Sequence, residues 1–134
     1  MSDPRAAHDA IDRLLASYPL LLDSGDVTAC VDLFVQDCEF VIDKDRVIAG
    51  RAALQQFFER VVDGGAGGIH LAAPGLVHVA PDGSTATMWQ SFLFVANGSN
   101  VVTRGMYRDT AVVDGDRWRF RRRDIELFPG APTA

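Results

Sequence analysis

The chain has 134 residues, of which 48% are hydrophobic and 23% are charged, and its formal net charge is −5. This length fits one domain over residues 1–134, and the apolar content is enough to form a core, which excludes a mainly disordered chain. The negative charge argues against a nucleic-acid partner, and no apolar run approaches the roughly 20 residues that a membrane span needs. The N-terminus lacks the apolar core of a signal peptide, so we expect a cytoplasmic protein.

The residues that commonly bind zinc are too scattered to form a site. Cys30 and Cys38 form no Cys-x-x-Cys pair, and the histidines are His8, His70 and His78. Structural zinc sites usually take their ligands in closely spaced pairs. We therefore expect two free thiols, no bound metal and no cofactor.

Apolar residues recur at helical spacing in three segments of the first half. The first helix is expected over Arg5–Asp23, with a kink or break at Pro19. Asp26 is a good N-cap for a second short helix, which we expect to run to Val35. A third helix is expected over Arg51–Val62, after a small hairpin.

Strand-like alternation accounts for most of the remaining chain. Cys38–Ile42 and Arg46–Ala49 form the small hairpin, and a glycine-rich loop over residues 63–68 follows the third helix. The later strand segments are Ile69–Ala80, with a bend at Pro74-Gly75, then Thr85–Ala96, Val101–Val113 and Arg117–Phe128, before a tail over residues 129–134. This order predicts an α+β fold, in which three N-terminal helices pack on a cone-shaped, curved sheet and enclose a pocket for a small apolar ligand.

Three polar residues are candidate catalytic groups. His70 opens an apolar strand, and histidine is the side chain best suited to proton transfer near neutral pH. Asp23, at the end of the first helix, is a candidate partner that would orient the imidazole, and Tyr18 is a candidate donor to a developing oxyanion. Each also has a structural interpretation, as a surface aspartate, a hydrogen-bonded histidine and a helix-packing tyrosine. Helical periodicity alone does not place Tyr18 and Asp23 on one face.

Four further residues are candidates for substrate binding: Trp89, Arg104, Tyr107 and Asp109. Tyr107 and Asp109 lie on the same side of one strand and face either the pocket or the sheet surface. Trp89 and its neighbour Met88 point to opposite faces, so only one of them can line the pocket. Arg104 is able to bind a carboxylate or an enolate, although a surface arginine is the ordinary alternative.

Several segments in a fixed order carry a resemblance to a known family. They are Tyr18–Asp26, Asp32–Asp37, Gly50 before the third helix, His70 before a strand, Gly105–Asp109 and residues 114–120. Over residues 7–128 the chain resembles the SnoaL-like branch of the nuclear-transport-factor-2-like superfamily. The resemblance implies a cystatin-like α+β barrel and a homodimer.

The same resemblance implies a type of chemistry. Tyr18, Asp23 and His70 are similar to the polar set of bile-acid 7α-dehydratase. Asp23 and His70 also resemble the Asp–His dyad of scytalone dehydratase and of hexachlorocyclohexane dehydrochlorinase. Those enzymes remove a carbon-bound proton and eliminate a leaving group without a cofactor.

The pattern of ketosteroid isomerase fits less well. The position that aligns with its catalytic base is Ile42, while Asp43 lies one residue away and on the opposite face of the strand. Asp109 does align with the second, hydrogen-bond-donating aspartate of that enzyme. The missing base counts against an isomerase of that type.

The sequence therefore predicts a cofactor-independent lyase, isomerase or polyketide cyclase with dehydratase-like chemistry, acting on a small hydrophobic cyclic or polyketide-like carbonyl compound. His70 would be the general base and then the acid, Asp23 would stabilise its charge, and Tyr18 would bind the carbonyl or leaving oxygen. Three alternatives stay open. They are a non-catalytic ligand-binding or dimerisation module, an epoxide-hydrolase-like hydrolase that uses Asp109 and Arg104, and a small partner subunit of a larger enzyme.

Overall fold

The structure is a computed structural model that describes residues 3–64, 67–98 and 100–128. Its helices are α1 (Pro4–Asp23), α2 (Val27–Val31) and α3 (Arg51–Asp63). Its strands are β1 (Phe34–Ile42), β2 (Arg46–Ala49), β3 (Gly68–Ala72), β4 (Leu76–Val79), β5 (Thr85–Ala96), β6 (Val102–Asp114) and β7 (Arg117–Phe128). Residues 65–66 of the expected glycine-rich loop, residue 99 and the expected tail over 129–134 lie outside the described residues.

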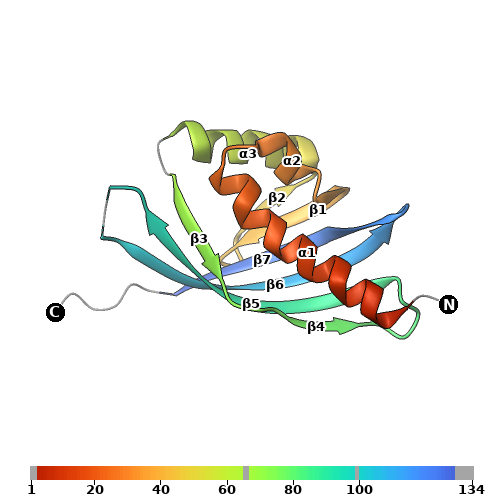
Figure 1. The fold of residues 1–134 in the computed structure, drawn as a ribbon. Coiled ribbons are helices and arrows are strands. Elements are labelled where there is room, and N and C mark those ends of the chain that lie inside the picture. Colours follow the sequence, from red (N-terminus) through yellow and green to blue (C-terminus); the bar gives the residue numbers. More distant parts are fainter. Residues whose placement is uncertain (1–2, 65–66, 99, 129–134) are drawn as a thin grey trace.

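These strands form one curved, unclosed sheet. Their order is β2-β1-β7-β6-β5-β3, and β4 also pairs with β5, next to β3. The pairing of β1 with β7 is parallel, whereas the neighbouring pairs along the sheet are antiparallel. The three helices lie over one face of this sheet (Figure 1). This is the α+β architecture that the order of helices and strands predicts.

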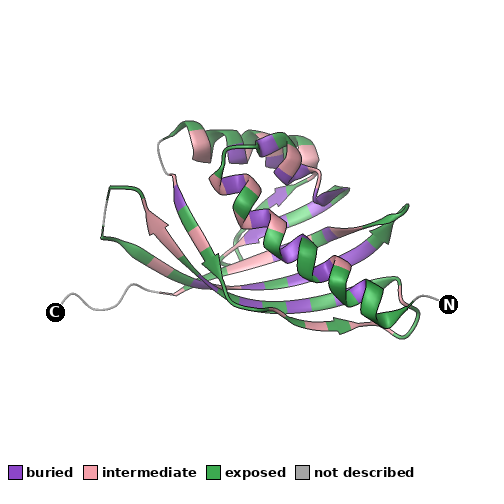
Figure 2. Ribbon diagram, in the orientation of Figure 1, coloured by how far each residue is buried: buried purple, intermediate pink, exposed green. Residues whose placement is uncertain are grey.

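The core lies between the helices and the concave face of the sheet. One side of α1 is buried, including Ile11, Leu14, Tyr18 and Leu22, because its apolar residues recur at helical spacing. Buried and exposed positions alternate along β5 and β6, as expected for strands with one covered face (Figure 2). The inward side chains of β5 and β6 therefore face the helices, where they can line a site.

The sequence predicts that α1 kinks or breaks at Pro19, and the prediction of a break is wrong. The helix runs without interruption through Pro19 to Asp23. A proline removes one amide donor, which leaves the remaining hydrogen bonds of a long, well-packed helix in place. The helix ends at Asp23. Gly25 follows with a φ of +83°, and the amide of Asp26 donates to the carbonyl of Leu21 at 2.9 Å.

The second helix is shorter than the sequence predicts. It begins after Asp26, which caps it as expected, but it ends at Val31 and not at Val35. The chain then enters β1 at Phe34, and the amide of Phe120 in β7 donates to the carbonyl of Leu33 at 2.8 Å. An apolar run fits both a helix and a strand, and here the pairing with β7 decides between them.

The bend at Pro74-Gly75 divides the predicted long strand into β3 and β4. β3 pairs with the second half of β5, and β4 pairs with the first half. A Cβ atom on Gly75 would lie 2.7 Å from Cδ1 of Leu15, so the absence of a side chain lets α1 lie close to the bend. The chain can therefore turn from β3 into β4 directly against α1.

Candidate active site

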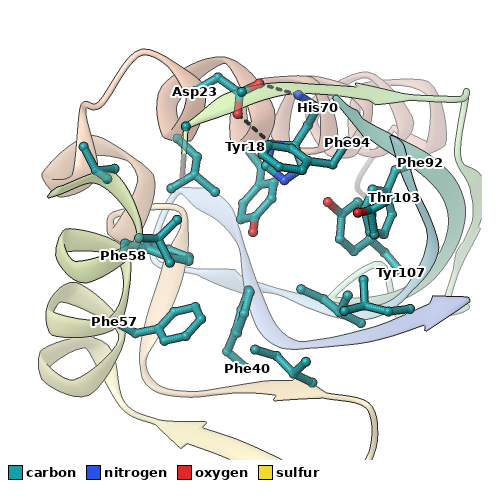
Figure 3. A pocket seen from close by; sticks show the side chains of 18 residues that line it. Tyr18, Asp23, Phe40, Phe57, Phe58, His70, Phe92, Phe94, Thr103 and Tyr107 are labelled. Carbon is teal, nitrogen blue, oxygen red and sulfur yellow. Dashed lines mark hydrogen bonds and ion pairs between the residues drawn. The ribbon is translucent and has the colours of Figure 1, made fainter. Parts of the chain in front are cut away.

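A cavity of about 360 Å³ lies between the helices and the concave face of the sheet. Aromatic rings form much of its wall: Phe40, Phe57, Phe58, Phe92 and Phe94 (Figure 3). Its polar groups come from Tyr18, Asp23, His70, Thr103 and Tyr107. No lysine or arginine is among the described residues that line it. An apolar cavity of this size with a few polar groups is typical of a small-molecule site.

Asp23 and His70 meet at one wall of this cavity. The backbone amide of His70 donates to Oδ2 of Asp23 at 2.7 Å, and the ring Nδ1 lies 2.6 Å from Oδ1 (Figure 3). The side chains are 18% and 17% exposed, so the pair is shielded but reachable from the cavity. Because an ionised carboxylate only accepts hydrogen bonds, this contact favours the tautomer of neutral imidazole in which Nδ1 carries the hydrogen and Nε2 keeps its lone pair.

Local structure explains why these two residues meet. Asp23 is the last residue of α1, and His70 lies in the edge strand β3, opposite Phe94 of β5. The carboxylate thus supplies an acceptor to an edge-strand amide as well as to the imidazole. The double contact fixes the orientation of the ring, which leans against Phe94 at a centroid distance of 4.6 Å.

Tyr18 lies five residues before Asp23 in the chain, on the buried side of α1. Its ring makes edge contacts with His70 and Tyr107, at centroid distances of 6.4 and 5.9 Å. Burial raises the pKa of the Tyr18 phenol well above its ordinary value, so the hydroxyl keeps its proton. The hydroxyl points into the cavity (Figure 3), where it can donate a hydrogen bond.

Tyr107 also lines the cavity, from β6. Its ring stacks on Phe92 at a centroid distance of 4.2 Å, with 12° between the ring planes. Burial raises its pKa too, so Tyr107 is a second neutral phenol in the cavity wall.

Asp109 lies deeper and does not line the cavity. It faces inward from β6, but its carboxylate is taken up by Arg123, with Nε–Oδ1 and Nη2–Oδ2 distances of 2.9 and 3.2 Å. Gln90 accepts a further hydrogen bond from Nη2 at 3.3 Å. Burial raises the pKa of the Asp109 carboxyl, and the charge of Arg123 opposes this rise. The Asp109 carboxylate therefore binds Arg123 and does not face the cavity as a group that could contact a substrate.

Trp89 and Arg104 also lie outside the cavity lining. Trp89 is 43% exposed and its ring stacks against the guanidinium of Arg108 on the outer face of the sheet. Arg104 is exposed on the same outer face, because it alternates with the inward residue Gly105. Met88, the neighbour of Trp89, is the one that points inward. Strand parity thus places Trp89 and Arg104 on the outer face, away from the lining of this cavity, and substrate binding by them stays a prediction.

The structure places Ile42 and Asp43, the two positions compared with the base of ketosteroid isomerase, in different surroundings. Ile42 lines the cavity with an apolar side chain, which cannot act as a base. Asp43 has a positive φ of 50° in the turn after β1, and its Oδ1 accepts the amide of Leu127 at 2.8 Å. Asp43 is thus a turn residue and not a group of the cavity.

Sequence analysis did not single out Gln90, Phe92, Phe94 or Thr103. Three of them share the inward parity of β5 with Met88, and that parity is readable from the alternation of the strand. Thr103 of β6 lies opposite Phe94 of β5 and also lines the cavity. Period-two alternation was therefore the signal that could have found the β5 residues.

A family model described as the SnoaL-like domain matches residues 4–124. The chain belongs to the SnoaL-like family. This confirms the resemblance seen in the sequence, and it accounts for nearly the whole described fold. Among curated proteins, no sequence matches the chain.

Solved structures agree with this assignment. An NTF2-like protein with a cystatin-like fold from Novosphingobium aromaticivorans is 28% identical, with a TM-score of 0.81 over 95% of this SnoaL-like chain and 85% of that chain. A protein from the same organism, provisionally assigned as a scytalone dehydratase, is 22% identical, with a TM-score of 0.81 over 96% and 89%. A cystatin-like protein of unknown function from Nostoc punctiforme is 22% identical, with a TM-score of 0.85 over 98% of each chain. The cystatin-like fold is therefore confirmed.

Two further observations concern metals and membranes. Within residues 3–64, 67–98 and 100–128, no three side chains of the types that bind metals are grouped so as to hold an ion. No helix in this part of the SnoaL-like chain is long and apolar enough to cross a membrane.

Proposed function

We propose that this SnoaL-like domain is a cofactor-independent lyase or isomerase that removes a carbon-bound proton from a small, hydrophobic carbonyl compound. The observation that carries the proposal is the Asp23–His70 pair, joined at 2.6 and 2.7 Å on the wall of an apolar cavity. The likeness to a protein provisionally assigned as a scytalone dehydratase supports this class through the fold alone.

His70 acts as the general base. With Nδ1 donating to Asp23, the lone pair of Nε2 is available to take a proton from the carbon next to the substrate carbonyl. The electron pair of the broken C–H bond passes into the carbonyl group and forms an enolate. Asp23 stabilises the imidazolium that results, because a carboxylate lies 2.6 Å from its Nδ1.

Tyr18 holds the substrate oxygen. Its neutral hydroxyl donates to the carbonyl, and the hydrogen bond strengthens as negative charge develops on that oxygen. The apolar wall around it, including Phe58 and Phe92, favours a substrate with a hydrophobic body and strengthens the hydrogen bond by excluding water.

The second half of the reaction returns the proton. In an elimination, the enolate reforms its carbonyl, the bond from the β-carbon to oxygen breaks, and the His70 imidazolium protonates the departing hydroxyl to give water. In an isomerisation, the imidazolium instead returns the proton to another carbon of the conjugated system. Both routes restore neutral His70 and need neither an oxidant nor a reductant.

The test follows proton abstraction directly. The protein is incubated in D₂O with a panel of hydrophobic β-hydroxy and β,γ-unsaturated ketones, with a chelator present, and loss of the α-proton signal is followed by NMR. We expect exchange or elimination for at least one compound, and a decrease of about 10² to 10⁴ in its rate in His70→Ala. His78→Ala is the matched control, because His78 is exposed on β4 and does not line the cavity.

The outcome separates the proposal from its main rival. Binding of panel compounds without exchange or elimination would favour a non-catalytic binding module. An exchange rate that is the same in His70→Ala and in the parent protein would contradict the role of the dyad.

A further inference from the structure

Arg123 is the largest fully buried side chain of the described fold, and it lies directly behind the cavity wall. It faces inward from β7, is 0% exposed, and is held by Asp109 and Gln90 through Nε and Nη2. Its third nitrogen, Nη1, is buried without a hydrogen-bond partner in the part of the chain that the structure describes. A buried donor left unpaired is unfavourable, so its presence needs an explanation.

Stability is a weak explanation for this arrangement. Moving a guanidinium and a carboxylate out of water costs about as much as their attraction returns, and apolar residues of similar volume are often equally stable in such places. The unpaired Nη1 adds to the unfavourable side. The position of the positive charge relative to its neighbours is the more informative feature.

The guanidinium lies on the faces of both tyrosine rings of this protein. Its central carbon is 3.6 Å from the ring centroid of Tyr107 and 4.3 Å from that of Tyr18. The sequence contains two tyrosines, and both line the cavity. The cation thus contacts the π faces of two phenols that line the cavity, although Arg123 itself is not among the lining residues.

The charge acts on both hydroxyl groups in the same direction. Burial raises the pKa of Tyr18 and of Tyr107, whereas Arg123 opposes that rise in each of them. Asp109 works against Arg123 by raising the pKa of each phenol, but its effect is the smaller of the two in both. The net contribution of the ion pair is therefore to make both phenols more acidic than burial alone would leave them.

We propose that Arg123 is a positioning residue that polarises the hydroxyl groups of Tyr18 and Tyr107 through their rings, so that the cavity prefers a ligand oxygen that carries negative charge. The ligands concerned are enolates and phenolates. The cavity obtains this preference without exposing a cationic side chain, which would also attract carboxylates and phosphates. The inference rests on the proposed role of Tyr18 as a donor to the substrate oxygen, but it does not depend on turnover.

The experiment measures the ionisation of a bound phenol. 4-Nitrophenol is titrated with the protein at several pH values, and its absorbance gives the preference for bound phenolate over bound phenol. In the double variant Arg123→Met, Asp109→Leu, which removes both charges together, we expect this preference to fall at least about tenfold. In Asp109→Asn, which keeps Arg123 and removes the opposing charge, we expect it to rise. Arg108→Met is the control, because Arg108 lies on the outer face against Trp89.

The opposite signs distinguish this role from a structural one. A side chain that only fills space would give a similar preference, or a similar loss, in both sets of variants, and that result would overturn the inference. If the double variant does not give a cooperative thermal transition, Asp109→Asn alone decides. A phenolate preference in Asp109→Asn that does not rise above that of the parent protein would then overturn the inference. Failure of the proposed function appears elsewhere, as absence of proton exchange while the phenolate preference persists.

Discussion

The ring of Phe92 fills the space in which a side chain at position 105 would begin. A Cβ atom on Gly105 would lie 2.5 Å from two ring carbons of Phe92 and 2.8 Å from the backbone oxygen of Glu126. Since Phe92 stacks on Tyr107, the glycine fixes the position of two residues of the cavity wall.

Gly105→Ala should therefore displace Phe92 and loosen the pair. The backbone oxygen of Glu126 cannot easily move, so we expect a loss of about 1–3 kcal/mol in the free energy of unfolding. Urea unfolding of the variant measures it, with Ser91→Ala, whose side chain is exposed on the neighbouring strand, as the control. Equal stability of Gly105→Ala and the parent protein would show that the ring adapts.

Asp23→Asn separates the charge of Asp23 from its backbone contact. Asparagine retains an oxygen that can accept the amide of His70, but it cannot stabilise the imidazolium. We expect the unfolding midpoint to change little, while turnover of any panel compound falls. The double variant with His70→Ala should lose little more than His70→Ala alone, since the pair acts as a unit. Full activity in both single variants would refute the dyad.

Much of the fold could be predicted from the sequence, because local patterns and tertiary structure agree over most of the chain. The bounds of β5 and β7 are the predicted ones, since turn residues precede each segment and mark where the strand begins. The end of α2 could not be predicted in this way. The residues after Val31 suit a helix or a strand, and their pairing with β7 is a long-range interaction that no local pattern contains.

The candidate site divides in the same manner. Asp23 and His70 are 47 positions apart in the chain, and only the packing of β3 beside the end of α1 brings them together. The resemblance to a known family supplied that pairing where periodicity did not. The inward position of Arg123 could not be predicted from alternation. The pairing of β6 with β7 shifts register between Thr110 and Ala111, and this shift reverses which residues of β7 face inward. Simple alternation from Phe120 would place Arg123 on the outer face.

The thiol of Cys30 should be inert in the native protein. It is 0% exposed, and burial raises its pKa to about 12, so almost none of it is thiolate at pH 8. Cys38 is equally buried, and burial raises its pKa as well. We expect no reaction with Ellman's reagent over an hour in buffer, and two reactive thiols per chain in guanidinium chloride. Rapid labelling of one thiol without denaturant would mean that this part of the core opens readily.

The outer face of the sheet should mediate a homodimer. Leu71 and Leu93 lie opposite each other on β3 and β5 and are 58% and 40% exposed, and Leu76 lies opposite Trp89 farther along the same face. Exposed apolar side chains gathered on one face often mark a contact site, and a stable dimer buries about 800 Å² on each partner. A sheet face of this kind, with exposed side chains on two paired strands, suits a symmetric contact between two copies.

Sedimentation of the parent protein at micromolar concentration should therefore give twice the chain mass of 14.6 kDa. Leu71→Glu with Leu93→Glu places two like charges at the centre of the contact, so this variant should sediment as a monomer. Ala53→Glu, on the exposed side of α3, adds charge in the other layer of the molecule and should leave the dimer intact. A parent protein that sediments at 14.6 kDa would exclude the homodimer, and a dimeric Leu71→Glu, Leu93→Glu variant would place the contact on another surface.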